Sequence, residues 1–181
     1  MATRKRPVNF SSTKLIFITI LLLAITLANA AGLRETKMTI YLQGFSTGPN
    51  ATVVAVAGIP GKHLSFTQFG TILVTDDPIT ETPDINSAQV GRAQGMYATA
   101  SLDGINSQVS ISILFTNTAY CGSILQIQGI SKQFDNVREL SVVSGTGRFR
   151  YARGYVTFET YFVDKSSVYS VVRCNISVLH Y

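Results

Sequence analysis

The side chains able to do ordinary catalytic chemistry are few and lie far apart along the chain. There are two histidines, His63 and His180, and neither accompanies a serine and an aspartate in a nucleophile motif. Cys121 and Cys174 are 53 residues apart with no CxxC spacing, which argues against a zinc site. No phosphate-binding or dinucleotide-binding glycine motif occurs. The sequence therefore predicts no metal and no cofactor.

Two adjacent carboxylates, Asp76 and Asp77, are the remaining pair of interest. They precede Pro78, and such a sequence is typical of a turn in which the aspartate side chains bond to the backbone. The alternative is that one of them faces a ligand. Arg92 can pair with one of the two carboxylates and fix the register of a strand.

The elements that must position these residues are β-strands. In Val109–Ile113, apolar residues alternate with serines, which is the pattern of a half-buried strand. Similar runs predict strands at 38–45, 51–58, 64–75, 90–100, 119–129, 139–144, 154–163 and 167–180. Eight or so strands with short connections indicate a sandwich or a closed antiparallel barrel, and an eight-stranded barrel can hold one small ligand.

Residues 1–30 have the features of a secretory signal peptide. Four bases, Arg4, Lys5, Arg6 and Lys14, precede the uncharged segment Leu15–Ala28, and Ala28-Asn29-Ala30 offers small residues for cleavage. The apolar segment is shorter than the roughly 20 residues that a membrane-spanning helix needs. A signal anchor is the alternative. Residues 31–181 form the predicted mature domain.

Removal of this segment lowers the net charge of the protein. The full chain has 181 residues and a formal net charge of +5, but residues 31–181 contain eleven bases and ten acids. A net charge of +1 gives no basis for electrostatic capture of nucleic acid.

The segment also places the chain in the secretory route. Asn50 and Asn175 each begin a glycosylation sequon, and Asn175 can carry a glycan only if its strand face points to solvent. In that oxidising route Cys121 and Cys174 either form a disulfide or remain free buried thiols.

Three ordered blocks resemble those of the plant dirigent protein family. They are VTDDPIT at 74–80, GRAQGMY at 91–97 and RELSVVSGTG at 138–147, followed by Ala152-Arg153-Gly154. The resemblance covers residues 38–181. It implies an eight-stranded antiparallel β-barrel, like those of lipocalins and allene oxide cyclases. It also implies secretion to the plant cell wall space (the apoplast) and a homo-oligomer, either a dimer or a trimer.

The function implied by the resemblance is control of stereochemistry. Dirigent proteins direct the coupling of phenoxy radicals from monolignols such as coniferyl alcohol towards optically active lignans. A separate oxidase of the laccase or peroxidase type makes the radicals, so no oxidative activity is expected of this chain. Orientation of two aromatic partners is a task that a cavity can perform by proximity alone.

Two other functions are compatible with the same resemblance. Some relatives act as acid–base catalysts on a quinone methide, as in pterocarpan ring closure, and this step benefits from a carboxylic acid near the methide oxygen. A non-catalytic wall or defence protein that binds phenolics or glycans is the other alternative.

The resemblance also assigns candidate site residues, with a departure from the family pattern. Gly44 and Ser131 stand where lignan-forming members carry aspartates, and neither can donate a proton as a carboxylic acid does. Tyr97 and Arg138 are retained. Tyr97 either lines the cavity or packs in the core. Arg138 either contacts a phenolic or quinone oxygen or pairs with an acid, Glu139 or Asp135.

Overall fold

The computed structural model describes residues 12–30, 32–164, 166 and 168–181. The chain divides into two compact units, Met1–Leu33 and Arg34–Tyr181. In the first unit, helix α1 (Ser12–Ala30) contains the apolar segment of the predicted signal peptide. The first eleven residues of that peptide, and residue 31 after the predicted cleavage point, lie outside the described ranges. Within those ranges, no helix combines the length and apolar character that crossing a membrane requires.

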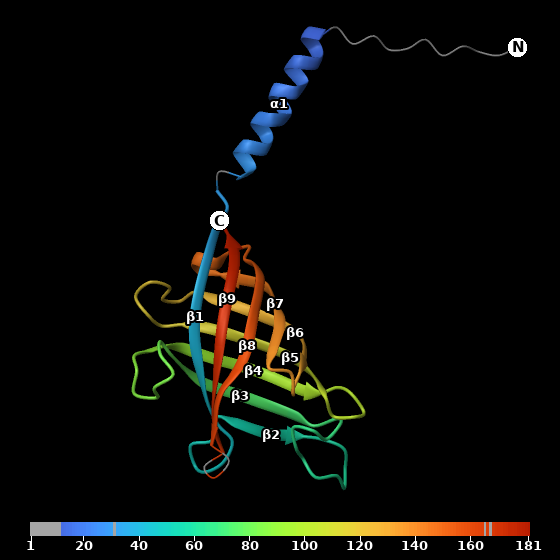
Figure 1. Cartoon of the computed structure of the whole chain (residues 1–181), viewed down its shortest axis with the longest axis vertical. Helices are drawn as coiled ribbons and strands as arrows, with labels where there is room; N and C mark the ends of the chain where they lie inside the picture. The colour runs from blue at the N-terminus through green and yellow to red at the C-terminus, as the bar shows by residue number, and fades with distance from the viewer. Residues whose placement is uncertain (1–11, 31, 165, 167) are drawn as a thin grey trace, which may run out of the picture. The chain divides into compact units, whose positions relative to one another are not determined.

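The second unit is a closed antiparallel β-barrel (Figure 1). Its strands in the described residues are β1 (Arg34–Phe45), β2 (Val53–Ala57), β3 (Ile72–Thr80), β4 (Gln89–Thr99), β5 (Asn106–Phe115), β6 (Ile124–Lys132), β7 (Val137–Thr146), β8 (Arg153–Asp164) and β9 (Tyr169–His180). Strand β1 pairs with β9 along its whole length and also with β3, which closes the sheet. The short β2 pairs with β3 beside β1. Eight strands, β1 and β3–β9, thus form the barrel, which confirms the fold predicted from the sequence.

Side chains alternate between the interior and the outer face, as the sequence pattern requires. On β5, Val109, Ile111 and Ile113 are buried in the apolar core, while Ser110 between them is exposed. The burial of apolar side chains on every second residue stabilises the barrel and orients each strand. The register of each strand therefore decides which polar residues point inward.

One end of the barrel is closed by aromatic side chains. The short 3₁₀ helix η1 (Gly147–Phe149) inserts Phe149, which is fully buried, among the rings of Phe115, Tyr120 and His180. The ring centroids lie 5.0–5.4 Å from that of Phe149, within the range of favourable aromatic contacts. His180 is held by a 2.8 Å hydrogen bond between its Nε2 and Thr36 Oγ1.

The turn predicted at Asp76-Asp77-Pro78 is wrong, because these residues lie in the middle of β3. The predicted strand at 64–75 is correspondingly displaced, and β3 begins at Ile72. Proline is tolerated here because no strand pairs with β3 opposite its nitrogen. On the edge that this nitrogen faces, β2 pairs with β3 only as far as Thr75, and β1 pairs with β3 only from Ile79. No ladder hydrogen bond is lost. The Asp76 N–H instead donates to the Thr52 carbonyl at 2.9 Å.

Replacing Phe149 with alanine tests the importance of the closed end. The change removes a fully buried ring and leaves a cavity, so the free energy of unfolding should fall by about 3–5 kcal/mol. Urea denaturation of the full chain measures this loss. The matched control is Phe134→Ala, which truncates an exposed ring and should change stability by less than about 0.5 kcal/mol. Equal effects of the two substitutions would contradict the role given to Phe149.

Candidate functional site

A cavity of about 240 Å³ lies at the other end of the barrel, where β1, β4 and β6 end and β5, β7 and β9 begin. Its walls are mainly apolar and are formed by Leu42, Val53, Val109, Ile111, Phe158 and Val172. Hydroxyl groups of five serine and threonine residues interrupt this surface, namely Ser46, Thr75, Ser107, Ser131 and Ser170. Apolar walls with a few polar groups are typical of sites for small organic ligands.

Asp77 is the acidic residue that lines this cavity in the described part of the chain. Its place on β3 points it inward, and only 7% of its surface remains exposed. Burial raises the pKa of the Asp77 carboxyl from 3.8 to about 6, because a charged carboxylate loses its hydration there. A hydrogen bond from Thr52 Oγ1 to Asp77 Oδ1 partly opposes this rise. Asp77 can therefore hold a proton in mildly acidic solution and donate it.

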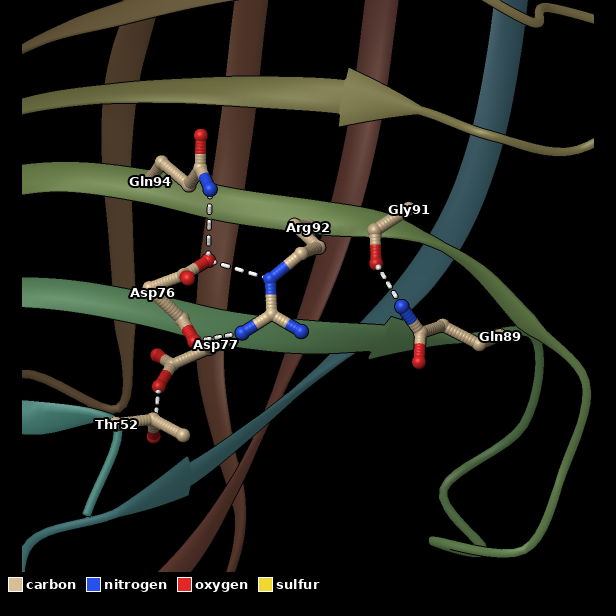
Figure 2. A network of polar contacts seen from close by, with 7 residues as sticks. All are labelled: Thr52, Asp76, Asp77, Gln89, Gly91, Arg92 and Gln94. Atoms are coloured by element: carbon tan, nitrogen blue, oxygen red, sulfur yellow. Dashed lines mark hydrogen bonds and ion pairs between the residues drawn. The ribbon is translucent and has the colours of Figure 1, made fainter. Parts of the chain in front are cut away.

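Asp76 points away from Asp77, as the alternation of β3 requires (Figure 2). On the outer face it accepts hydrogen bonds from Arg92 Nε at 2.5 Å and Gln94 Nε2 at 3.0 Å, both from β4. The bond from Arg92 is the main cause that lowers the pKa of Asp76. Arg92 thus pairs with one of the two aspartates, as the sequence indicates. Asp76 is a structural carboxylate and takes no part in the cavity.

Tyr97 lines the cavity and at the same time packs against the core. Its ring stacks on that of Phe66 with centroids 5.8 Å apart. Burial raises the pKa of the Tyr97 phenol, which keeps the proton on its oxygen. Phe66 and Tyr97 thus bring two stacked aromatic rings to the cavity wall.

Arg138 brings a positive charge to the same cavity. Its guanidinium donates to Thr160 Oγ1 at 3.0 Å and to the Gln133 carbonyl at 3.4 Å. Among the described residues it forms no salt bridge with Glu139 or Asp135. Burial lowers the pKa of Arg138, although a guanidinium stays charged at physiological pH. Arg138 is therefore available to an oxygen of a bound ligand.

Gly44 and Ser131 both line the cavity. A Cβ atom built on Gly44 would lie 3.7 Å from both carboxylate oxygens of Asp77. A carboxyl group at position 44 would thus stand next to Asp77, and in this chain Asp77 stands without it.

Three residues of the site carried no clear signal in the sequence. Thr52 and Phe66 belong to loops, and only the fold brings them to Asp77 and Tyr97. Thr75 lies two residues before Asp77, so an inward Asp77 would have implied an inward Thr75. The predicted turn concealed this relation.

The remaining candidates lie outside the cavity. Cys121 is exposed and Cys174 is buried, and both thiols are free, so Cys121 is not the buried thiol that one alternative expected. Asn50 is exposed after the Gly48 turn. Asn175 is half-buried on the outer face of β9, where its amide accepts from Thr39 and donates to Glu159. No cluster of three metal-ligating side chains occurs in the described residues.

Comparison with known proteins identifies relatives over most of the chain. The family model for dirigent-like proteins matches residues 35–179. Dirigent protein 11 of Arabidopsis thaliana is 35% identical over 178 residues, which cover 92% of this chain and 91% of the relative. Pterocarpan synthase 1 of Glycyrrhiza echinata is 36% identical and covers 83% of this chain and 82% of the relative.

Solved structures agree with the sequence comparison. The pterocarpan synthase dirigent protein GePTS1 superposes with a TM-score of 0.76 at 34% identity, covering 83% of this chain and 87% of the other. The pterocarpan synthase dirigent protein PsPTS1 gives 0.75 at 33% identity, with 82% and 96% covered.

The buried state of Asp77 predicts an unusual dependence of stability on pH. A carboxyl whose pKa is raised on folding stabilises the fold when protonated, and this contribution is lost as pH rises from about 4 to above about 6. The shift from 3.8 to about 6 corresponds to about 3 kcal/mol. The free energy of unfolding of Asp77→Asn, relative to that of the unsubstituted protein, should therefore rise by about 3 kcal/mol as pH increases from about 4 to about 8. Urea denaturation at both pH values measures the difference.

The neighbouring variant Asp76→Asn is the matched control, with the opposite sign. The lowered pKa of Asp76 means that its contribution is present at neutral pH and lost on acidification. This variant should therefore lose stability relative to the unsubstituted protein as pH rises. Parallel pH profiles for Asp77→Asn and the unsubstituted protein would contradict a buried, protonated Asp77.

Proposed function

The chain belongs to the dirigent family, and from this premise we propose that its barrel binds one phenolic molecule and catalyses a step through a quinone methide, with Asp77 as the acid. The observation that carries the proposal is the position of Asp77, a buried carboxyl in the cavity with its pKa raised to about 6. General acids work best when their pKa lies near the working pH. The similarity to pterocarpan synthases supports the same reaction class.

The substrate class is an aromatic alcohol with a phenolic hydroxyl that is conjugated to its benzylic carbon. Asp77 gives its proton to the benzylic oxygen, the C–O bond breaks, and water leaves. The phenol loses its proton to solvent water, so the organic product is a neutral quinone methide. A second hydroxyl then adds to the benzylic carbon, the quinone oxygen takes up a proton from solvent water, and the proton of the adding hydroxyl returns to Asp77. Loss of one water is the net change, and no oxidant is required.

Arg138 and the aromatic pair account for the rest of the site. In this proposal the Arg138 guanidinium faces the phenolic oxygen and stabilises the negative charge that gathers there when the quinone methide is attacked. Phe66 and Tyr97 stack on an aromatic ring of the substrate. A ring fixed in this way exposes one face of the benzylic carbon, and this would set the stereochemistry of addition.

Radical coupling is the second candidate, because the apolar walls can orient rings without any acid. In this case a separate laccase-type or peroxidase-type oxidase supplies phenoxy radicals from monolignols, and the products are optically active lignans. A phenolic-binding wall or defence protein would use the same cavity without turnover. The cavity of about 240 Å³ is small for a ligand site and favours a single occupant over two radicals.

For the cellular setting we propose secretion to the apoplast after cleavage behind Ala30, and assembly into a homo-oligomer. Asn50 is the favoured glycan site because it is exposed at a turn. Asn175 is disfavoured, since its amide is bonded to Thr39 and Glu159 across the outer face of the barrel.

Exchange of the benzylic oxygen tests the acid role without knowledge of the natural substrate. In water labelled with heavy oxygen, para-hydroxybenzyl alcohol should incorporate the label when the protein forms the quinone methide and water adds back. Mass spectrometry measures the rate. Asp77→Asn should reduce it about 100-fold or more, and exchange should decline as pH rises through about 6. Asp76→Asn, the adjacent outer carboxylate, should keep at least about half of the rate.

Coniferyl alcohol with a one-electron oxidant provides the competing measurement. An optically active coupling product, together with no oxygen exchange, would favour the radical template over the acid. Binding of phenols without exchange or stereoselective coupling would indicate the binding protein.

A further inference from the structure

A gap in the cavity wall beside Asp77 exists because residue 44 has no side chain. A Cβ atom there would lie 3.0 Å from Ser170 Oγ and 3.7 Å from Asp77 Oδ1 and Oδ2. The backbone of Gly44 does not adopt the left-handed conformation, so the fold does not require glycine at this position. Space for a ligand next to the carboxyl is therefore a direct consequence of this residue. We call the space bounded by Gly44, Thr75, Asp77 and Ser170 the Gly44 gap.

Thr75 presents a nearly buried hydroxyl group to the cavity beside the Asp77 carboxyl. The side chain is only 6% exposed, and Oγ1 finds no donor or acceptor at hydrogen-bonding distance and angle in the described chain. An interaction with the Asp77 carboxyl, short of the geometry of a regular hydrogen bond, helps to lower the pKa of that carboxyl and leaves the hydroxyl able to bond to a ligand. Buried hydroxyls without a partner are rare in proteins, and they are usually satisfied by water or a ligand.

From these two observations we propose that the Gly44 gap is the subsite for the oxygen that leaves from, or adds to, the benzylic carbon. This inference rests on the proposed function, because it places the reacting oxygen of that same substrate. The Thr75 hydroxyl bonds to this oxygen and holds it against the Asp77 carboxyl, which delivers the proton. Thr75 is thus a positioning residue, and Gly44 determines which substituent the site accepts.

The dimensions of the gap determine what can occupy it. A single methyl group on residue 44 would already lie 3.0 Å from Ser170 Oγ, closer than ordinary contact, so the cavity beside Gly44 admits only a small group. The side chains that bound the Gly44 gap are polar, namely the hydroxyls of Thr75 and Ser170 and the carboxyl of Asp77. A hydroxyl is therefore favoured over an apolar substituent of equal size.

A pair of phenols that differ by one oxygen tests the subsite. Calorimetric titration should show that para-hydroxybenzyl alcohol binds about tenfold more tightly than para-cresol, as one buried hydrogen bond allows. Gly44→Ala fills the gap, and Thr75→Val removes the hydroxyl at constant shape. Each should reduce the preference to within about twofold, with the affinity for para-cresol unchanged.

Thr75→Ser is the matched control, because it keeps the hydroxyl and should retain the preference for the alcohol. Gly44→Ala should fold, since the Ser170 hydroxyl can rotate away from the added methyl group. If that variant fails to fold, Thr75→Val alone decides the question.

The outcomes separate the subsite from the proposed function. An unchanged preference in both variants, or no preference in the unsubstituted protein, would overturn the subsite. Oxygen exchange by a protein that binds para-hydroxybenzyl alcohol no more tightly than para-cresol would reject the Gly44 gap alone. Tighter binding of the alcohol without oxygen exchange would reject Asp77 as the acid and leave the subsite in place. Failure to bind either phenol would reject both.

Discussion

Closure of the sheet is the constraint on which the rest of this structure depends. Strand β1 pairs with β9 on one side and with β3 on the other, so the sheet has no freedom to slip without opening the barrel. A shift of β3 by a single residue would turn Asp77 outward and Asp76 inward. Because apolar neighbours such as Leu73 and Ile79 must face the core, the chain cannot make this exchange. The chemistry of the cavity is thus determined by hydrophobic burial elsewhere in the same strand.

The adjacent aspartates show how strongly the environment, rather than the residue type, sets acidity. Asp76 is half exposed, and its pKa is lowered chiefly by the bond from Arg92. Asp77 is buried, and desolvation raises its pKa to about 6. The ion pair of Asp76 links β3 to β4 on the outer face, and Asp77 forms no salt bridge in the part of the chain that the structure describes. One carboxylate therefore supports the strand, and the other remains free to exchange protons.

The fold could be predicted from the sequence to a large extent, since its main signals are local. Alternation in Val109–Ile113 is visible within five residues, and the three family blocks occur as continuous segments. The site was harder to predict. Asp-Asp-Pro has the local chemistry of a turn, and it forms a strand only because β4 pairs with it and neighbouring strands leave the proline nitrogen unopposed. The approach of Gly44 to Asp77 crosses the β1–β3 seam, which exists only after the barrel has closed.

The aromatic closure around Phe149 has a kinetic consequence. Because Phe149 and its neighbouring rings fill one end of the barrel, a ligand in the cavity can exchange only through the opposite end. In the proposed reaction, substrate entry and product departure therefore share this one opening, so a product must leave the barrel before the next substrate can enter.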